Sequence, residues 1–210
     1  MIASKRTLVL IGLMLIGILA ACGGDSAPYS ETFDEPGNWT VGDDTYTEGK
    51  IEEGVYDLLI KGDDVRRWTH AGESFSDGAY EVEATQVEGP IDNGYGMLFR
   101  ADTDAGNFYL FKVSGDGYVW IGRYRDNAEE LPIVGNHWIQ STAVNQGLDA
   151  TNVLRVEAES GNLIFYVNGQ EVGRITDNTF ASGDIGLYAE TLGSPGVRVQ
   201  FDNFTVEPIQ

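Results

Sequence analysis

The sequence has little cysteine, histidine or positive charge. Its 210 residues include one Cys, two His and 13 Lys+Arg against 33 Asp+Glu, which gives a formal net charge of −20. A single Cys excludes an internal disulfide framework, and two distant histidines, His70 and His137, exclude a Cys/His zinc cluster. The scarcity of cations disfavours a nucleic-acid partner, because binding a phosphate backbone needs clustered Lys and Arg.

Apolar residues are abundant enough to build a core. They make up 42% of the chain, a content typical of a folded domain and not of a charge-rich disordered protein. No linker, charge run or low-complexity tract occurs after Tyr29. We therefore predict one domain over residues 29–210.

The first 21 residues have the pattern of an export signal. Lys5 and Arg6 precede an apolar stretch, residues 8–21, that is shorter than the roughly 20 residues of a membrane-spanning helix. Residues 19–22, Leu-Ala-Ala-Cys, resemble the lipobox of bacterial lipoproteins. The resemblance implies removal of residues 1–21, lipidation of Cys22, a lipidated tether over residues 22–28, and a domain anchored to a bacterial membrane outside the cytoplasm. The alternative is an ordinary secretory peptide with a chance Cys.

The rest of the chain has the pattern of β-strands separated by turns. Segments rich in Val, Ile, Tyr, Phe and Trp alternate with Asp-Gly, Asn-Gly and Ser-Gly pairs, and all six prolines fall outside the apolar runs. Asn168-Gly169 predicts a tight hairpin with positive φ at both residues. The one helical candidate, residues 126–131, is stopped by Pro132. We predict an all-β protein, a two-sheet antiparallel sandwich of about a dozen strands.

Strand pairing can be predicted for the middle of the chain. A loop over residues 102–106 places Phe99 beside Tyr109, and a four-residue loop over 114–117 places Phe111 opposite Trp120. Alternation then predicts an aromatic core face formed by Tyr80, Val82, Ala84, Met97, Phe99, Tyr109, Phe111, Tyr118 and Trp120. The outward face is predicted to carry Glu81, Glu83, Leu98, Arg100, Phe108, Leu110, Lys112, Val119, Ile121 and Arg123.

Five motifs carry a resemblance to a known superfamily. They are YGMLFR (95–100), YVWIG (118–122), FYVNG (165–169), GDIGL (183–187) and VQFDNF (199–204). In this order they resemble the concanavalin A-like lectin/glucanase superfamily, especially laminin-G-like domains and three-keto-disaccharide hydrolase domains of exported bacterial proteins. The resemblance covers nearly all of residues 31–206. It implies a jelly-roll sandwich and glycan contact on the concave sheet.

The catalytic pattern of laminarinase-like glycosidases in this superfamily is incomplete here. Those enzymes carry a nucleophilic Glu, an assisting Asp two residues on and an acid/base Glu further along one strand. Glu81 and Glu83 begin the pattern, but Thr85 and Gln86 follow, and neither can protonate a leaving group. Glu81 and Glu83 are therefore weak catalytic candidates. The alternative interpretation is a solvated strand face paired with Arg100 or Lys112.

Several side chains are candidates for holding a sugar. Cations can bind hydroxyl or carboxylate groups, and an exposed Trp can stack on a sugar ring. The predicted ligand-binding residues are Glu81, Glu83, Arg100, Lys112, Arg123, Trp68 and Trp138. The alternative assigns the cations to salt bridges with Glu81 and Glu83.

Acidic residues near both ends of the domain suggest a metal site. Glu31, Asp34 and Asp202 lie in segments similar to the terminal strands of carbohydrate-binding jelly rolls, where the first and last strands lie side by side and share a structural Ca²⁺. Oxygen ligands of this kind suit calcium. Strand ends rich in Asp and Asn are also common without metal.

Together these features predict a surface-anchored lipoprotein whose β-sandwich binds carbohydrate or cell-wall glycan without cleaving it. The first alternative is a carbohydrate-active hydrolase of keto-disaccharide or glucan type. The second is a structural or protein-interaction module.

Overall fold

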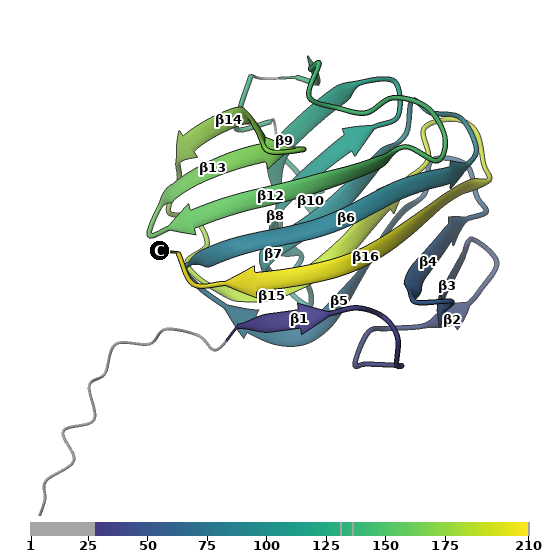
Figure 1. Ribbon diagram of the computed structural model, residues 1–210, viewed down its shortest axis with the longest axis horizontal. Helices are drawn as coiled ribbons and strands as arrows, with labels where there is room; N and C mark the ends of the chain where they lie inside the picture. Colours follow the sequence, from purple (N-terminus) through teal and green to yellow (C-terminus); the bar gives the residue numbers. More distant parts are fainter. Residues whose placement is uncertain (1–27, 131, 136, 210) are drawn as a thin grey trace, which may run out of the picture.

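The protein is an all-β sandwich. The computed structural model describes residues 28–130, 132–135 and 137–209, and the predicted signal sequence and Cys22 lie outside these residues. The described part contains strands and turns, and none of it is a helix long and apolar enough to cross a membrane. Two antiparallel sheets form the layers (Figure 1).

The larger sheet has nine strands. Its order is β14 (Gln170–Thr176), β13 (Asn162–Val167), β12 (Thr151–Glu159), β6 (Gly78–Glu88), β16 (Val197–Glu207), β4 (Val55–Ile60), β3 (Thr47–Glu52) and β2 (Gly42–Asp43), and β1 (Tyr29–Glu31) also pairs with β16. The first and last strands therefore lie side by side, as predicted, with Tyr29 opposite Val206.

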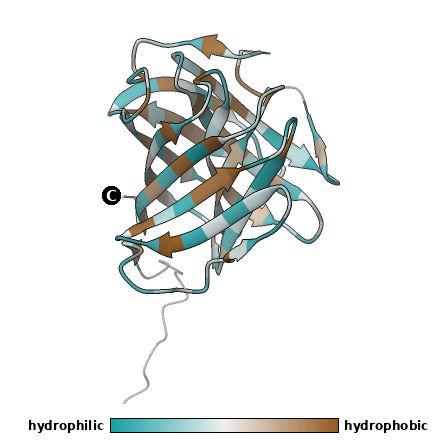
Figure 2. Ribbon diagram, turned by 90° about the vertical axis from the view of Figure 1, so that its right-hand side faces the viewer, coloured by the Kyte–Doolittle hydropathy of each residue, from teal (hydrophilic) through white to brown (hydrophobic). Residues whose placement is uncertain are grey.

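The smaller sheet has seven strands. Its order is β10 (Ala128–Glu129), β9 (Tyr118–Arg125), β8 (Asn107–Ser114), β7 (Gly94–Asp102), β15 (Gly183–Glu190) and β5 (Arg66–Phe75), and β11 (Ile139–Gln140) also pairs with β9. Hydrophobic and hydrophilic positions alternate along many strands of the sandwich (Figure 2).

The core lies between the sheets. It combines inward side chains of both layers, such as Tyr80 and Val82 of β6 with Met97, Phe99 and Phe111 of the seven-stranded sheet. All five are fully buried. This burial of apolar and aromatic surface is the main stabilising contribution to the fold.

Two turns show how local chemistry sets the strand connections. Asn168 and Gly169 have φ of 50° and 77°, and Val167 pairs with Gln170, so the predicted tight hairpin is confirmed. The helical candidate that begins at residue 126 is not a helix over its described residues, 126–130. Asp126 and Asn127 both have positive φ and turn the chain from β9 into β10, which no helix can accommodate.

The predicted pairing is confirmed for β7 with β8 and wrong for β8 with β9. Phe99 lies opposite Tyr109, as expected. Ser114 pairs with Tyr118, however, so the turn is one residue shorter than predicted and Phe111 lies opposite Ile121. A slip of one residue exchanges the faces of a strand. Trp120 therefore points outward, while Val119 and Ile121 point into the core.

The sandwich has two distinct ends. At one end, here called the Tyr29 end, β1 begins, β16 finishes beside the start of β6, and the Tyr29 ring lies 5.5 Å from that of Phe75. At the opposite end, β6 finishes at Glu88 next to Arg198 near the start of β16. The chain thus enters the fold at the Tyr29 end (Figure 1).

Candidate functional site

The predicted carboxylates and cations do not share one face. Glu81 and Glu83 lie on the outward face of β6 in the nine-stranded sheet, whereas Lys112 belongs to β8 of the other sheet. Glu81 pairs with Arg155 at 3.4 Å, and Glu83 lies opposite Asp202 in the strand ladder. The structure therefore separates Glu81 and Glu83 from the cations that were expected to face them.

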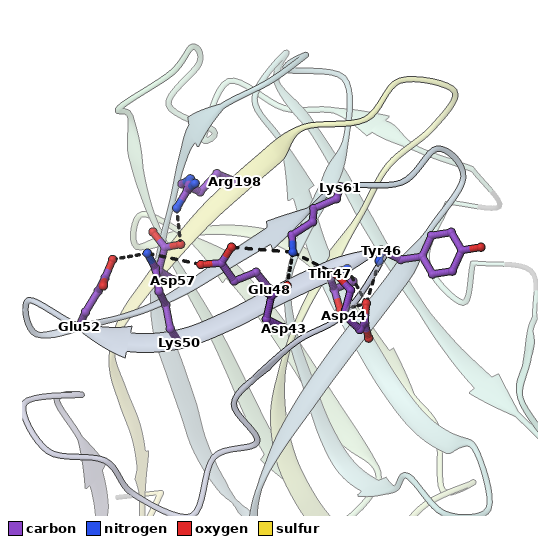
Figure 3. Close-up of polar contacts among 10 residues, drawn as sticks. All are labelled: Asp43, Asp44, Tyr46, Thr47, Glu48, Lys50, Glu52, Asp57, Lys61 and Arg198. Carbon is purple, nitrogen blue, oxygen red and sulfur yellow. Dashed lines mark hydrogen bonds and ion pairs between the residues drawn. The ribbon is translucent and has the colours of Figure 1, made fainter.

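The outward face of the nine-stranded sheet is dominated by its own ion pairs. Lys50 contacts Glu48 and Glu52, and Lys61 contacts Glu48 and Asp43 (Figure 3). Both lysines are partly exposed and already have carboxylate partners, and ion pairs near the surface contribute little stability.

Arg100 is enclosed in the protein and is not on an outward face. Its φ of 49° and the register shift of β7 against β8 turn the side chain inward, where it is 1% exposed. The guanidinium donates hydrogen bonds to carbonyl oxygens of Ser76, Ser160 and Phe180 and to the carboxylate of Asp77. These contacts hold together turns at the Tyr29 end.

Arg123 lies at a sheet edge and is also engaged. It pairs with Glu130 and Asp177 and donates to the Thr179 hydroxyl at 2.7 Å. Burial raises the pKa of Asp177, but hydrogen bonds from Tyr109 and Thr179 and the charge of Arg123 outweigh it, so the net pKa is lowered. The pair ties β9 to the segment before β15.

Lys112, Trp68 and Trp138 do share a face. They lie on the outward side of the seven-stranded sheet, where a second apolar cluster is formed by Leu98, Ala101, Phe108, Leu110, Trp120, Tyr124 and Tyr188, with Trp68 and Trp138 packed against it. Most members of this cluster are fully buried, whereas Trp68 and Trp138 are half-buried. The two indoles are therefore aromatic surfaces on this face that solvent can reach.

A charged network lies beneath the indoles. Lys112 Nζ is 2.7 Å from Glu190 Oε1 and 3.8 Å from Glu129 Oε2. Arg66 is 3.6 Å from Glu190 and 3.9 Å from Glu129. The Tyr188 hydroxyl donates to Glu190 at 2.7 Å, and burial together with this carboxylate raises the Tyr188 pKa. Two cations and two anions balance one another here.

Three aromatic rings surround the Lys112 ammonium. Its Nζ lies 4.6 Å from the centroid of Trp120, 5.1 Å from that of Trp138 and 5.3 Å from that of Tyr188. Cation–π attraction of this kind is stronger when the cation is desolvated. Lys112 therefore positions Trp138 from below and is too buried to meet a ligand itself.

An open cavity lies against Trp138 at the end opposite Tyr29. This Trp138 pocket has a volume of about 240 Å³ and is lined by Asp92, Ser114, Asp116, Tyr118, Trp138 and Leu192. Asp116 accepts a hydrogen bond from the Ser114 hydroxyl. Trp138 and Tyr118 provide half-exposed aromatic surface, and Asp92 and Asp116 provide acceptor oxygens. The arrangement suits a small ligand with an apolar ring face and a polar rim.

The predicted calcium ligands are not gathered into one group. Glu31 accepts the amide hydrogen of Phe33, Asp34 accepts the Thr32 hydroxyl, and Asp202 accepts the amide hydrogen of Asn203. Among the described residues, no set of three or more His, Cys, Asp or Glu side chains is placed to hold a metal. The shared Ca²⁺ stays a prediction.

Sequence reasoning found Trp138 but missed its neighbours in the pocket. Asp92 and Asp116 lie in turns, where Asp is common for conformational reasons, so nothing in the sequence distinguishes them as ligand-facing. Glu190 ends a strand with no motif around it. The single available signal was Trp138 itself, an aromatic residue in a turn-rich segment.

The fold is that of the concanavalin A-like sandwiches. The chain is similar to the carbohydrate-binding module CBM66 from Bacillus subtilis, with 22% identity over 81% of this chain and 96% of that one and a TM-score of 0.63. It is similar to a prokaryotic beta-1,3-1,4-glucanase (lichenase) derived from a mouse hindgut metagenome, with 14% identity over 88% and 100% of the two chains and a TM-score of 0.63. It is also similar to the Bacillus licheniformis beta-glucanase, with 14% identity over 89% of this chain and 100% of that one and a TM-score of 0.60. No protein-family model and no curated protein sequence matches the chain. The predicted sandwich fold is thus confirmed, and the similarity to these proteins is one of fold.

Proposed function

We propose that the protein is an exported lipoprotein, anchored through Cys22, whose β-sandwich binds a carbohydrate in the Trp138 pocket without cleaving it. The observation that carries the proposal is the pairing of half-exposed Trp138 and Tyr118 with Asp92 and Asp116 around one cavity. Aromatic rings contact the apolar face of a sugar, and carboxylates accept hydrogen bonds from its hydroxyl groups. A fold shared with a carbohydrate-binding module and with glucanases agrees with this assignment.

The position of the pocket agrees with a lipid anchor. The chain enters the fold at Tyr29, and the Trp138 pocket opens at the other end of the sandwich. A domain tethered through residues 22–28 would present this pocket away from the membrane. Tethering raises the effective concentration of a weak site at the cell surface.

A hydrolase acting through Glu81 and Glu83 receives less support. The two glutamates lie on the charged outward face of the nine-stranded sheet, where Glu81 is paired with Arg155. Arg100, which was predicted to lie on the same outward face, is enclosed at the Tyr29 end. Glycoside hydrolysis needs an acid and a second carboxylate on either side of the scissile bond, and these residues offer no such cleft.

A glycan array probed with the full chain, purified in detergent, tests the binding site. We expect Trp138→Ala to weaken binding of every positive glycan by about ten-fold or more, because a buried aromatic contact is worth ~1.5–3 kcal/mol. Tyr46→Ala is the matched control, since Tyr46 is 60% exposed in the connection between β2 and β3 of the other sheet. Product analysis on each positive glycan detects turnover, which would favour the hydrolase. A blank array would favour a structural or protein-interaction role.

The anchor is tested separately in cells. Metabolic labelling with a fatty-acid analogue should label the wild type and leave Cys22→Ser unlabelled, and the variant should leave the membrane fraction. Equal membrane association of both proteins would contradict lipidation at Cys22, whatever the glycan array shows.

A further inference from the structure

A second cavity lies on the outward face of the seven-stranded sheet, at the Tyr29 end. This His70 pocket has a volume of about 310 Å³, and its lining includes His70, Glu73, Ser74, Asp102, Thr103 and Asp184. The Trp138 pocket lies at the other end of the same strands. Both cavities are near the lower limit of ligand pockets and suit one small ring each.

Irregular strand pairing builds the His70 pocket. Asp184 pairs with Ser74 and Gly186 with His70, so three residues of β5 lie opposite Ile185 alone. On the other side of β15, Asp184 pairs with Ala101 and Gly186 with Leu98, so two residues of β7 lie opposite Ile185. Bulges redirect side chains and open the surface of a sheet. Here β15 has a bulge on each side, and both bulges lie opposite Ile185.

Asp184 holds the imidazole of His70 in place. Its carboxylate lies 3.0 Å from His70 Nδ1 and accepts amide hydrogens of Gly72, Glu73 and Ile185. The contact engages Nδ1, so Nε2 is the ring nitrogen available to a ligand. The His70 side chain is 42% exposed and can reach one.

The chemistry of the lining restricts the ligand. Neither Lys nor Arg contributes to the pocket, and Glu73 and Asp102 do, so an anionic group would be repelled. Imidazole, carboxylate and hydroxyl groups together donate to and accept from the hydroxyls of a neutral sugar. Trp68, two residues before His70 on the same face of β5, adds a half-buried aromatic surface next to the pocket.

We propose that the His70 pocket is a second saccharide subsite, so that one neutral oligosaccharide chain runs along the strands from the Trp138 pocket over Trp68 to His70. The inference rests on the proposed function of the Trp138 pocket. Gly94 at the start of β7 and Asp102 at its end separate the two pockets by roughly 25 Å at ~3.3 Å per residue. The length favours a chain of several sugar residues over a disaccharide.

Titration calorimetry with the full chain in detergent tests the proposal. The probes are linear cello-, laminari-, xylo-, manno-, chito- and fructo-oligosaccharides, each as the disaccharide and the hexasaccharide. In the series that binds, we expect the hexasaccharide to bind at least about ten-fold more tightly than the disaccharide, because it can occupy both linked subsites at once. His70→Ala should remove this advantage and leave disaccharide affinity unchanged. Thr103→Trp, which fills the pocket and keeps the His70–Asp184 contact, should do the same.

The outcomes separate this inference from the proposed function. Disaccharide binding that Trp138→Ala abolishes, with no gain for the hexasaccharide, would overturn the second subsite alone. A length advantage that persists in both His70→Ala and Thr103→Trp would do so as well. Absence of binding by every series, or binding that is indifferent to Trp138→Ala, would overturn the Trp138 site and with it the second subsite. Tyr46→Ala again serves as the control.

Discussion

Lys112 Nζ lies 2.7 Å from Glu190 Oε1, and both side chains are almost completely buried on the outward face of the seven-stranded sheet. A buried charge is costly unless it is paired and hydrogen-bonded. The Tyr188 hydroxyl donates a further hydrogen bond to Glu190, and the aromatic rings around Lys112 contact its ammonium group. The pair therefore supports the surface that carries Trp138 from within the protein.

Breaking this pair on one side should be strongly destabilising. We expect Lys112→Met or Glu190→Gln to lower the free energy of unfolding by about 3 kcal/mol, because each leaves the other group without its main partner. The double variant K112M/E190M should lose less than the sum, since no charge of the pair is left unpaired. Urea unfolding measures all three. Arg174→Ala, at an exposed pair with Glu171, is the control, with an expected loss of about 0–1 kcal/mol. Single variants within the range of this control would contradict the argument.

The sequence predicted the sandwich and most turns, but one register failed for a physical reason. Both faces of β7 and β8 are buried. Apolar residues therefore occupy the outward face, as at Leu98 and Leu110, as well as the core face, as at Met97 and Phe111. Alternation then carries no information about which face is the core. The length of the turn between β8 and β9 decides which residues of β9 face the core. Asp116-Gly117 is compatible with turns of more than one length, so the sequence does not determine it.

The candidate site was predictable only in part, because its members come from separate loops. Trp68, Lys112 and Trp138 do share a face, and a Trp near a turn was the signal. Arg100 was placed outward by alternation, but a positive φ reverses its direction. Arg100 lies in the register shift between β7 and β8. An irregularity of this kind depends on the neighbouring strands and leaves no local pattern in the sequence.

Alkaline pH should destabilise the fold through buried tyrosines. Burial raises the pKa of Tyr95 to about 12. A tyrosine in the unfolded chain has a pKa near 10. The contribution of neutral Tyr95 to the free energy of unfolding is therefore complete below about pH 10 and is lost as the pH rises toward 12. We expect Tyr95→Phe to reduce the fall in unfolding free energy over this interval, measured by urea denaturation at several pH values. Tyr46→Phe is the control at an exposed position. An identical fall in the wild type and Tyr95→Phe would show that Tyr95 does not contribute.

Calcium removal tests the paired terminal strands. Since Glu31, Asp34 and Asp202 are engaged with separate neighbours, we expect EDTA to leave the melting temperature unchanged. The measurement is thermal denaturation with EDTA and after addition of Ca²⁺. A melting temperature that falls with EDTA and recovers with Ca²⁺ would instead support the shared ion that the resemblance implies.

Substitution of Arg100 separates a structural role from a ligand-binding role. Its guanidinium is enclosed at the Tyr29 end, 2.9 Å from both the Ser160 carbonyl oxygen and the Asp77 carboxylate. Arg100→Met removes the four hydrogen bonds of the enclosed guanidinium and its ion pair with Asp77, and we expect the free energy of unfolding to fall by about 3 kcal/mol. Glycan affinity, measured on the folded protein at a temperature well below its melting point, should stay unchanged for disaccharides, because the Trp138 pocket lies at the other end. Wild-type stability combined with lost disaccharide binding would assign Arg100 to the ligand after all.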